Sequence, residues 1–281
     1  MSVATITAAD VNKLRQMTGA GMMDCKKALV EAEGDFEKAV DFLRKKGQKV
    51  SAARAGNATS EGTVLVNLNA DATSATLLAF ACETEPVSKV EDFKNLAQAI
   101  LDLAVSKDAK TAEEVSDLVF EDGRTVAEAI TELTGKTGEK LAIVSFEKVV
   151  GEKIVSYIHS NGKLAVLVSL KNVGSAEVEA IGKDVAMQIA AMRPIAVDKD
   201  GVDASIVARE IEVGKEQARA EGKPEEMLEK IALGKLNKFY KDSTLLNQEF
   251  VKDTSKSVAQ VLDSVNKGLT VAEFKRIAIG A

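Results

Sequence analysis

The side chains best suited to nucleophilic or metal chemistry are two cysteines, Cys25 and Cys82, and one histidine, His159, and the chain has no other residue of either type. A zinc site would need these three distant residues to converge without the paired spacing that Cys and His ligands normally show. A Cys–His nucleophilic pair would bridge a similar separation, and no nucleophile turn is recognisable. We therefore expect no metal, no cofactor and no covalent catalysis by these residues.

A second candidate is Gly135-Lys136-Thr137, which is similar to the end of a phosphate-binding loop. Such a loop needs another glycine at the position of Ile130, so we interpret the match as chance. Catalytic carboxylates remain open among the 43 acidic residues, but none stands in a distinctive constellation. The residues favour a protein that acts by binding and is not an enzyme.

The composition is that of an intracellular globular protein. The chain has 281 residues, 46% of them hydrophobic, and a net charge of -6 from 37 basic and 43 acidic side chains. This balance predicts no direct nucleic-acid partner and no membrane partner. The two cysteines suit buried, reduced thiols, and no run approaches the ~20 apolar residues of a membrane span. The first ten residues lack the basic and apolar regions of a signal peptide, so we expect a cytoplasmic protein.

The elements that carry these residues begin with a predicted three-helix module over residues 1–47. Thr7 is a suitable N-cap for a first helix that ends near Met17, and Asp35 can cap a third helix that Gly47 stops. The second helix, ending at Gly34, turns Cys25, Ala28 and Leu29 inward.

Two apolar residues of this module, Met22 and Met23, have no evident role in its core. They follow a glycine-rich turn over residues 18–21. Exposed apolar side chains on so small a module suggest contact with a partner, although core packing is about as common for either methionine taken alone.

Residues 48–60 combine basic side chains with Gly, Ser and Ala and contain few large apolar residues. We interpret this segment as a linker. Its charges could meet ribosomal RNA or an acidic partner, but a solvated tether is the favoured interpretation.

The rest of the chain contains a weak internal repeat of a hairpin followed by a helix. Apolar strand patterns precede a helical pattern in both copies, and Asn161-Gly162 is a strong hairpin signal in the second copy. The predicted strands and helices lie at 63–68, 75–81, 93–103, 153–159, 164–170 and 178–191. The repeat predicts an α+β core of two similar subdomains, residues 61–150 and 151–281.

An insertion at residues 203–240 has helical periodicity, with a turn at 221–224 between two apolar stripes. It predicts an antiparallel helical hairpin that protrudes from the second subdomain. Gly214 and Gly234 should each cost ~1 kcal/mol relative to Ala, and close approach of the two helices would explain both.

The segment TGAGMMDCKKAL, residues 18–29, resembles a long signature of bacterial elongation factor Ts. The resemblance implies a ubiquitin-associated-like N-terminal module, a two-subdomain core and a coiled-coil arm. It implies a guanine-nucleotide exchange factor that binds the translational GTPase elongation factor Tu, in its GDP-bound and nucleotide-free forms. A ubiquitin-associated-like adaptor that has lost exchange activity is the alternative.

The resemblance also implies a site after the second strand of the core. The family has Thr-Asp-Phe-Val there, and its phenylalanine wedges between helices of the GTPase near the Mg²⁺ site. This chain has Thr84, Glu85, Pro86 and Val87, so the acid is kept in kind and the aromatic wedge is absent. We expect these four residues to form a loop that Pro86 stiffens.

Further contacts with the GTPase are implied at matching positions. They comprise Arg15, Met22, Met23 and Lys26 in the N-terminal module, Gly138 and His159 in the core, and Phe250 and Val251 near the C-terminus. Without the resemblance, His159 would be an ordinary histidine at a strand end.

Overall fold

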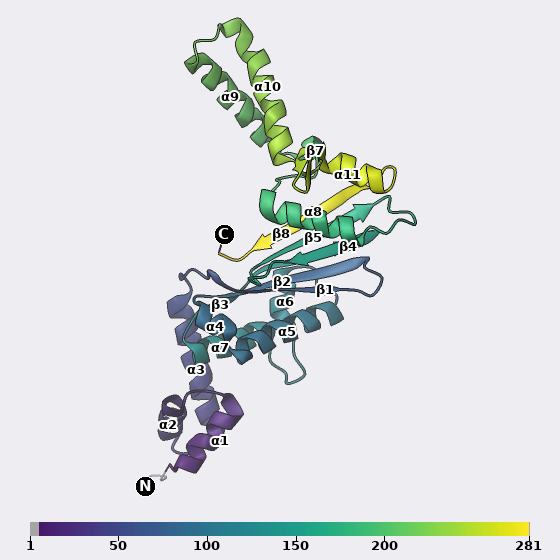
Figure 1. The fold of residues 1–281 in the computed structure, drawn as a ribbon. Coiled ribbons are helices and arrows are strands. Elements are labelled where there is room, and N and C mark those ends of the chain that lie inside the picture. The colour runs from purple at the N-terminus through teal and green to yellow at the C-terminus, as the bar shows by residue number, and fades with distance from the viewer. Residues whose placement is uncertain (1–5, 281) are drawn as a thin grey trace.

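The computed structural model describes residues 6–280; residues 1–5, where the predicted N-terminal module begins, and residue 281 lie outside the described part. Figure 1 shows an N-terminal group of helices, a body of two stacked sheets with helices on both outer faces, and a pair of helices extending from the far side. The mixture of helices and antiparallel sheets makes this an α+β protein. No helix between residues 6 and 280 combines the length and apolar character that a membrane span requires.

The first three helices form what we call the three-helix unit: α1 (Ala8–Thr18), α2 (Met22–Glu31) and α3 (Phe36–Arg54). Thr7 caps α1 in a reciprocal capping box with Asp10, as the sequence predicts, and Asp35 caps α3 by accepting from the backbone N–H of Lys38 at 3.1 Å. Fully buried side chains such as Leu14 and Leu29 form the core of the unit.

The predicted end of the third helix at Gly47 is wrong, because α3 continues to Arg54. The helix continues past Gly47 because it packs against α7 (Val126–Thr137), and Gly47 is buried in that contact. The first seven residues of the predicted linker are therefore helical. Tertiary packing has overridden the low helix propensity of glycine here.

The first sheet has the antiparallel order β1-β2-β3, with β1 (Glu61–Leu68), β2 (Ser74–Cys82) and β3 (Leu141–Val150). One face is covered by α4 (Glu85–Lys89), α5 (Glu91–Ser106), α6 (Ala112–Asp117) and α7. The rings of Phe80 and Phe93 stack 4.7 Å apart between β2 and α5. This cluster anchors the end of β2, and so the segment that follows it.

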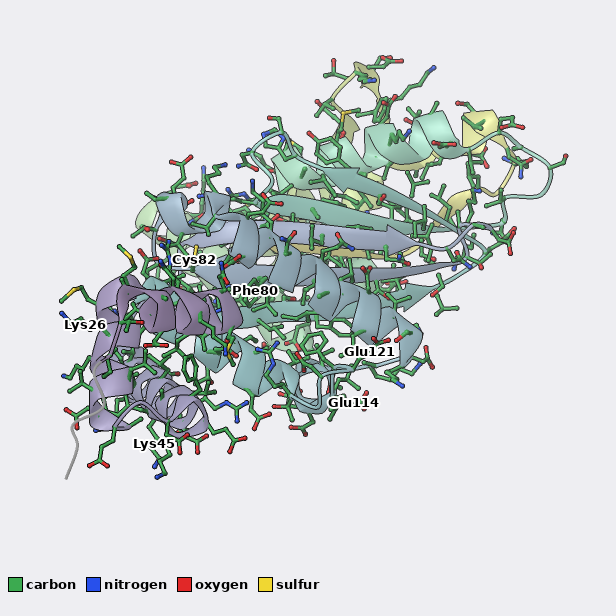
Figure 2. All side chains as sticks on the ribbon, turned by 90° about the horizontal axis from the view of Figure 1, so that it is seen from below. Lys26, Lys45, Phe80, Cys82, Glu114 and Glu121 are labelled. Carbon is green, nitrogen blue, oxygen red and sulfur yellow. The ribbon has the colours of Figure 1, made fainter. Side chains whose placement is uncertain are left out.

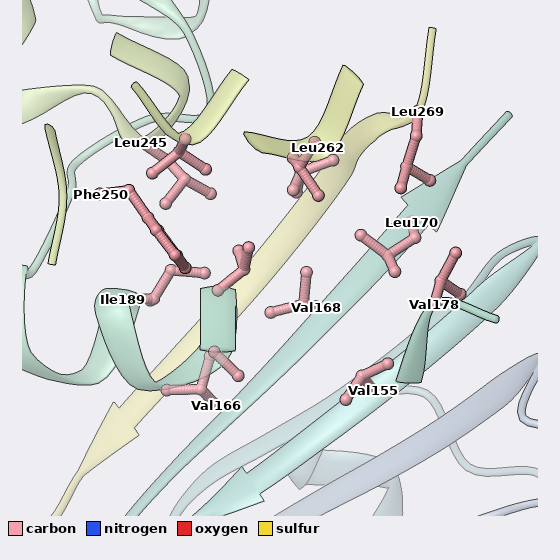
Figure 3. Close-up of a cluster of buried hydrophobic side chains, with 14 of the residues drawn as sticks. Val155, Val166, Val168, Leu170, Val178, Ile189, Leu245, Phe250, Leu262 and Leu269 are labelled. Carbon is pink, nitrogen blue, oxygen red and sulfur yellow. The ribbon is translucent and has the colours of Figure 1, made fainter. Parts of the chain in front are cut away.

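The second sheet repeats this arrangement with the order β4-β5-β8, formed by β4 (Lys153–Ile158), β5 (Leu164–Lys171) and β8 (Thr270–Ala278). Its outer face is covered by α8 (Glu179–Met192) and α11 (Val258–Val265), while β6 (Glu249–Phe250) and β7 (Asp253–Ser257) form a small separate ladder. Figure 3 shows the apolar cluster between this sheet and its helices.

The inner faces of the two sheets pack on each other through a third apolar cluster that includes Leu77, Ile154 and Leu167. The layers are therefore helix, sheet, sheet and helix. Burial on both faces explains why β2 and β5 are nearly continuous apolar runs without polar alternation.

Helices α9 (Ala204–Ala220) and α10 (Glu225–Ser243) lie side by side and extend away from the sheets (Figure 1). A Cβ on Gly214 would lie 3.1 Å from the Cα of Ala232, so a close helix approach explains this glycine. The same explanation is wrong for Gly234, since no described atom beyond the neighbouring backbone of its own helix lies within 4 Å of where its Cβ would be.

Candidate partner-binding site

The segment after β2 is a short helix and not the predicted loop. Thr84 is the N-cap of α4, Glu85 is its first residue and Pro86 lies in its first turn. Proline is tolerated there because the first N–H groups of a helix have no partner within the helix. The hydroxyl of Ser88 donates to the carbonyl of Glu85 at 2.7 Å and tightens the turn.

Two carboxylates join this segment to the chain between α7 and β3. Glu83 accepts from the backbone N–H of Lys140 at 2.6 Å, and Glu139 accepts from the N–H of Thr84 at 3.0 Å and from its hydroxyl at 2.6 Å. Each segment thus supplies a carboxylate to the backbone of the other. We call this pair of contacts the carboxylate brace.

The brace extends to the end of the three-helix unit through Glu83. Its carboxylate also accepts from Arg54 and from the side-chain amide of Asn57, both at 2.9 Å. The hydrogen bond from the Lys140 backbone, followed by those from Asn57 and Arg54, lowers the pKa of Glu83, whose side chain is 15% exposed. Glu83 therefore remains charged at neutral pH and joins three segments.

The brace brings together two of the predicted contact regions. Gly138 has a left-handed φ of 73° at the end of α7, directly before Glu139, so it lies beside the start of α4. Thr84, Glu85 and Pro86 are exposed, whereas Val87 is half-buried against the apolar cluster between the first sheet and its helices. The exposed part of this surface is therefore polar, with the proline ring as its apolar contribution.

His159 lies at the same edge of the body. It directly follows β4 and is exposed, and its Nδ1 lies 2.8 Å from the hydroxyl of Tyr157. The turn after it touches β1, since Lys163 pairs with Glu61 at 2.9 Å and Glu61 is opposite Cys82 in the first sheet. The end of β2 and the β4–β5 turn are thus held at one edge.

The four predicted contact residues of the three-helix unit are all exposed: Arg15, Met22, Met23 and Lys26. Met22 and Met23 begin α2 with exposed fractions of 56% and 77%, so the core of the unit does not use them. Figure 2 shows Lys26 at the outside of this unit.

The last predicted pair divides into a buried and an exposed residue. Phe250 is 5% exposed and packs beside Ile189 in the second core (Figure 3), while Val251 is 47% exposed. The buried amide of Gln188 holds this segment by accepting from Val251 N–H and donating to the Glu249 carbonyl, both at 2.9 Å. Val251 is therefore the apolar side chain that a partner could contact at this point. It lies beside the helices of the second sheet, apart from the brace.

Sequence reasoning missed the residues that position these surfaces. Glu83 and Glu139 have partners 57 and 55 residues away, and no local pattern indicates such pairs. Gln188 was detectable, because a polar residue among the apolar positions of a buried helix needs a hydrogen-bond partner.

The cysteines offer little chemistry. Both are buried, and burial followed by the nearby Glu139 charge raises the pKa of the Cys82 thiol to about 11. A thiol with so high a pKa is a poor nucleophile at neutral pH. Between residues 6 and 280, no cluster of three or more His, Cys, Asp or Glu side chains is arranged to hold a metal ion.

Comparisons with known proteins agree along the chain. A family model described as Elongation factor TS matches residues 83–281. The chain is 66% identical to Elongation factor Ts of Cytophaga hutchinsonii over 99% of this chain and 100% of the relative. It is 54% identical to the protein of the same name from Amoebophilus asiaticus, over 98% and 99% of the two chains, and 41% identical to that of Chloroherpeton thalassium, over 99% of both.

These matches identify a translation elongation factor that takes part in protein biosynthesis. The chain belongs to the elongation factor Ts family.

Proposed function

We propose that this chain is a cytoplasmic guanine-nucleotide exchange factor for elongation factor Tu and acts without covalent chemistry. In this proposal the three-helix unit is a ubiquitin-associated-like module, residues 61–150 and 151–281 form two core subdomains, and the α9–α10 pair is a protruding coiled-coil arm. The exchange surface comprises Thr84, Glu85, Pro86 and Val87 together with Gly138 and His159.

The observation that carries the proposal is the carboxylate brace. It holds the exposed start of α4 beside Gly138 through hydrogen bonds of 2.6 to 3.0 Å. A surface that is already ordered loses little conformational entropy on binding, so more of its interaction energy is available to deform the partner.

Exchange activity follows from the thermodynamic linkage between binding of the factor and binding of GDP. A factor that binds the nucleotide-free GTPase more tightly than the GDP form must weaken GDP binding by the same ratio. Glu85, with an exposed carboxylate, and the imidazole of His159 are the polar groups of this edge suited to displacing elements around the phosphates and Mg²⁺.

The three-helix unit supplies a separate anchor in this account. Met22 and Met23 are long, flexible and exposed, which suits them to an apolar groove on a partner. Arg15 and Lys26, which are also exposed, add positive charge to the same unit. Val251, whose backbone N–H is held by Gln188, is the apolar contact that the second sheet and its helices would make with the partner.

An adaptor without exchange activity is a second candidate, and Pro86 favours it. Proline at this position has far less apolar reach than the phenylalanine of the family motif and cannot fill the same pocket. Such an adaptor would bind the GTPase through the three-helix unit and leave GDP in place.

Calorimetric titration separates the two functions. The chain should bind nucleotide-free elongation factor Tu at least ~100-fold more tightly than the GDP form, which is ~2.7 kcal/mol of coupling. Equal affinities for the two forms would support the adaptor, and no binding to either would refute both.

A further inference from the structure

Helices α3 and α7 touch through a pair of glycines, Gly47 and Gly135. A Cβ on Gly135 would lie 2.7 Å from the Cα of Gly47, and a Cβ on Gly47 would lie 3.0 Å from the carbonyl oxygen of Thr131. Both distances are to backbone atoms, which cannot swing aside as a long side chain can. The two helix backbones are therefore in direct contact at this crossing.

This contact explains two glycines that sequence patterns misassign. Gly47 has the position of a helix stop, and Gly135 belongs to the segment similar to a phosphate-binding loop, yet both lie inside continuous helices. Glycine is disfavoured in helix interiors, so its presence at both sides of one crossing points to a need for close approach.

The crossing lies between the two surfaces of the proposed function. Toward its N-terminus, α3 packs on α1 and α2, and α2 carries Met22 and Met23. Toward the C-terminus it ends at Arg54, which pairs with Glu83 of the carboxylate brace at 2.9 Å. The Lys140 ammonium also donates to the carbonyls of Ala55 and Asn57, at 2.6 and 3.0 Å.

Beyond the crossing, the three-helix unit does not lie flat on the body. A cleft of about 460 Å³ opens there, lined by Met17 and Asp24 of the unit and by Arg124 and Lys136 of the body. The orientation of the unit therefore depends on the α3–α7 crossing together with the polar contacts at the end of α3.

We propose that Gly47 and Gly135 are positioning residues that set the angle at which the three-helix unit is presented relative to α4 and His159. That the two glycines set this angle follows from the geometry alone, while the consequence for partner binding rests on the proposed function. Two contact surfaces on one rigid frame engage a partner together only if their geometry matches, and a changed angle loses that advantage.

The test compares Gly135→Ala with a matched control, Gly234→Ala, which adds the same methyl group inside a helix where no described atom beyond the neighbouring backbone of that helix lies within 4 Å. Spin labels are attached at Gln16→Cys on α1 and Lys94→Cys on α5, both exposed, since the native cysteines are buried. Pulsed electron paramagnetic resonance then measures the distance between the unit and the body.

Gly135→Ala should shift or broaden this distance by ~1–3 Å, because carbon atoms need ~3.5–4.0 Å between them and the tilt is amplified along α3. Gly234→Ala should match the wild-type distance. Affinity for elongation factor Tu should fall about tenfold for Gly135→Ala only, while the melting transition stays cooperative.

An unchanged distance in Gly135→Ala would overturn the proposal. If that variant does not fold, Gly47→Ala, whose predicted clash is milder, decides by the same measurement. A shifted distance with unaltered affinity would refute the role in partner binding and leave the geometric role standing. If the wild-type chain binds no elongation factor Tu, the proposed function fails, and the distances still report on the crossing.

Discussion

The hydroxyl of Tyr157 lies 2.8 Å from Nδ1 of His159, on the same side of a strand end. This hydrogen bond can run in either direction, and we expect the hydroxyl to donate to Nδ1, which keeps the proton of a neutral imidazole on Nε2 and makes Nε2–H a fixed donor for a partner. Tyr157 thus orients the one histidine of the chain.

Tyr157→Phe should remove the preference of the His159 imidazole for the Nε2–H tautomer. Nitrogen-15 spectra of the neutral imidazole should show the Nε2–H form in the wild type and a mixture in the variant, with no other histidine signal to confuse the assignment. GDP release should slow by ~2–10-fold, the equivalent of one hydrogen bond of ~0.5–1.5 kcal/mol. A wild type with its proton on Nδ1 would contradict the assignment.

Replacing both Met22 and Met23 with Ala should weaken binding of elongation factor Tu by ~2 kcal/mol, because each thioether leaves water in the complex. The melting temperature should barely change, since the two side chains are 56% and 77% exposed. Leu29→Ala is the contrasting control: Leu29 is fully buried, and its truncation should cost ~2–5 kcal/mol of stability. A double mutant that melts early but binds normally would place the methionines in the core.

Glu83 should make stability depend on acid pH. Its pKa is lowered in the folded state, so its contribution is present above the unfolded pKa of ~4.3 and is lost as pH falls through the lower folded pKa. The wild type should be more stable than Glu83→Gln at pH 7, and the difference should shrink below about pH 4.3. Chemical denaturation of both proteins across this range measures it; a constant difference would show that the charge of Glu83 contributes nothing.

The α9–α10 pair should be dispensable for folding of the body. Its helices pack chiefly on each other, and Gly214 lies close against the backbone of Ala232. Replacing residues 203–240 with a short Gly/Ser turn should leave a cooperative unfolding transition, since loop-closure free energy varies slowly with length. Circular dichroism of the shortened chain checks this, and loss of the sheet signal would mean that the pair stabilises the body.

Local chemistry predicted much of the fold. Thr7 and Asp35 cap their helices as expected, and the Asn161-Gly162 turn joins β4 to β5 with Gly162 at a φ of 68°. These features depend on side chains and backbone preferences within a few residues, which a sequence displays directly.

The incorrect predictions and the unpredicted hydrogen bonds have a common physical cause, which is contact between segments that are distant in the sequence. Gly47 indicates a helix end until α7 is known to lie against it, and Gly234 does not lie at a helix contact although Gly214 does. The candidate contact residues rest on the resemblance to the family and stay predictions, whereas no pattern indicates the carboxylates that join the segments of Thr84 and Gly138. Glu83 meets the backbone of Lys140 across 57 positions, and such a bond leaves no local pattern.

Exchange activity is measured by the rate at which fluorescent GDP leaves elongation factor Tu in a stopped-flow instrument, with and without this chain. We expect release that rises with the concentration of the chain and reaches at least ~100-fold above the spontaneous rate, a barrier lowered by ~2.7 kcal/mol. The Met22→Ala/Met23→Ala variant should need a higher concentration to reach the same plateau. A release rate that stays at the spontaneous value while the two proteins demonstrably bind would contradict the exchange function and leave the adaptor in its place.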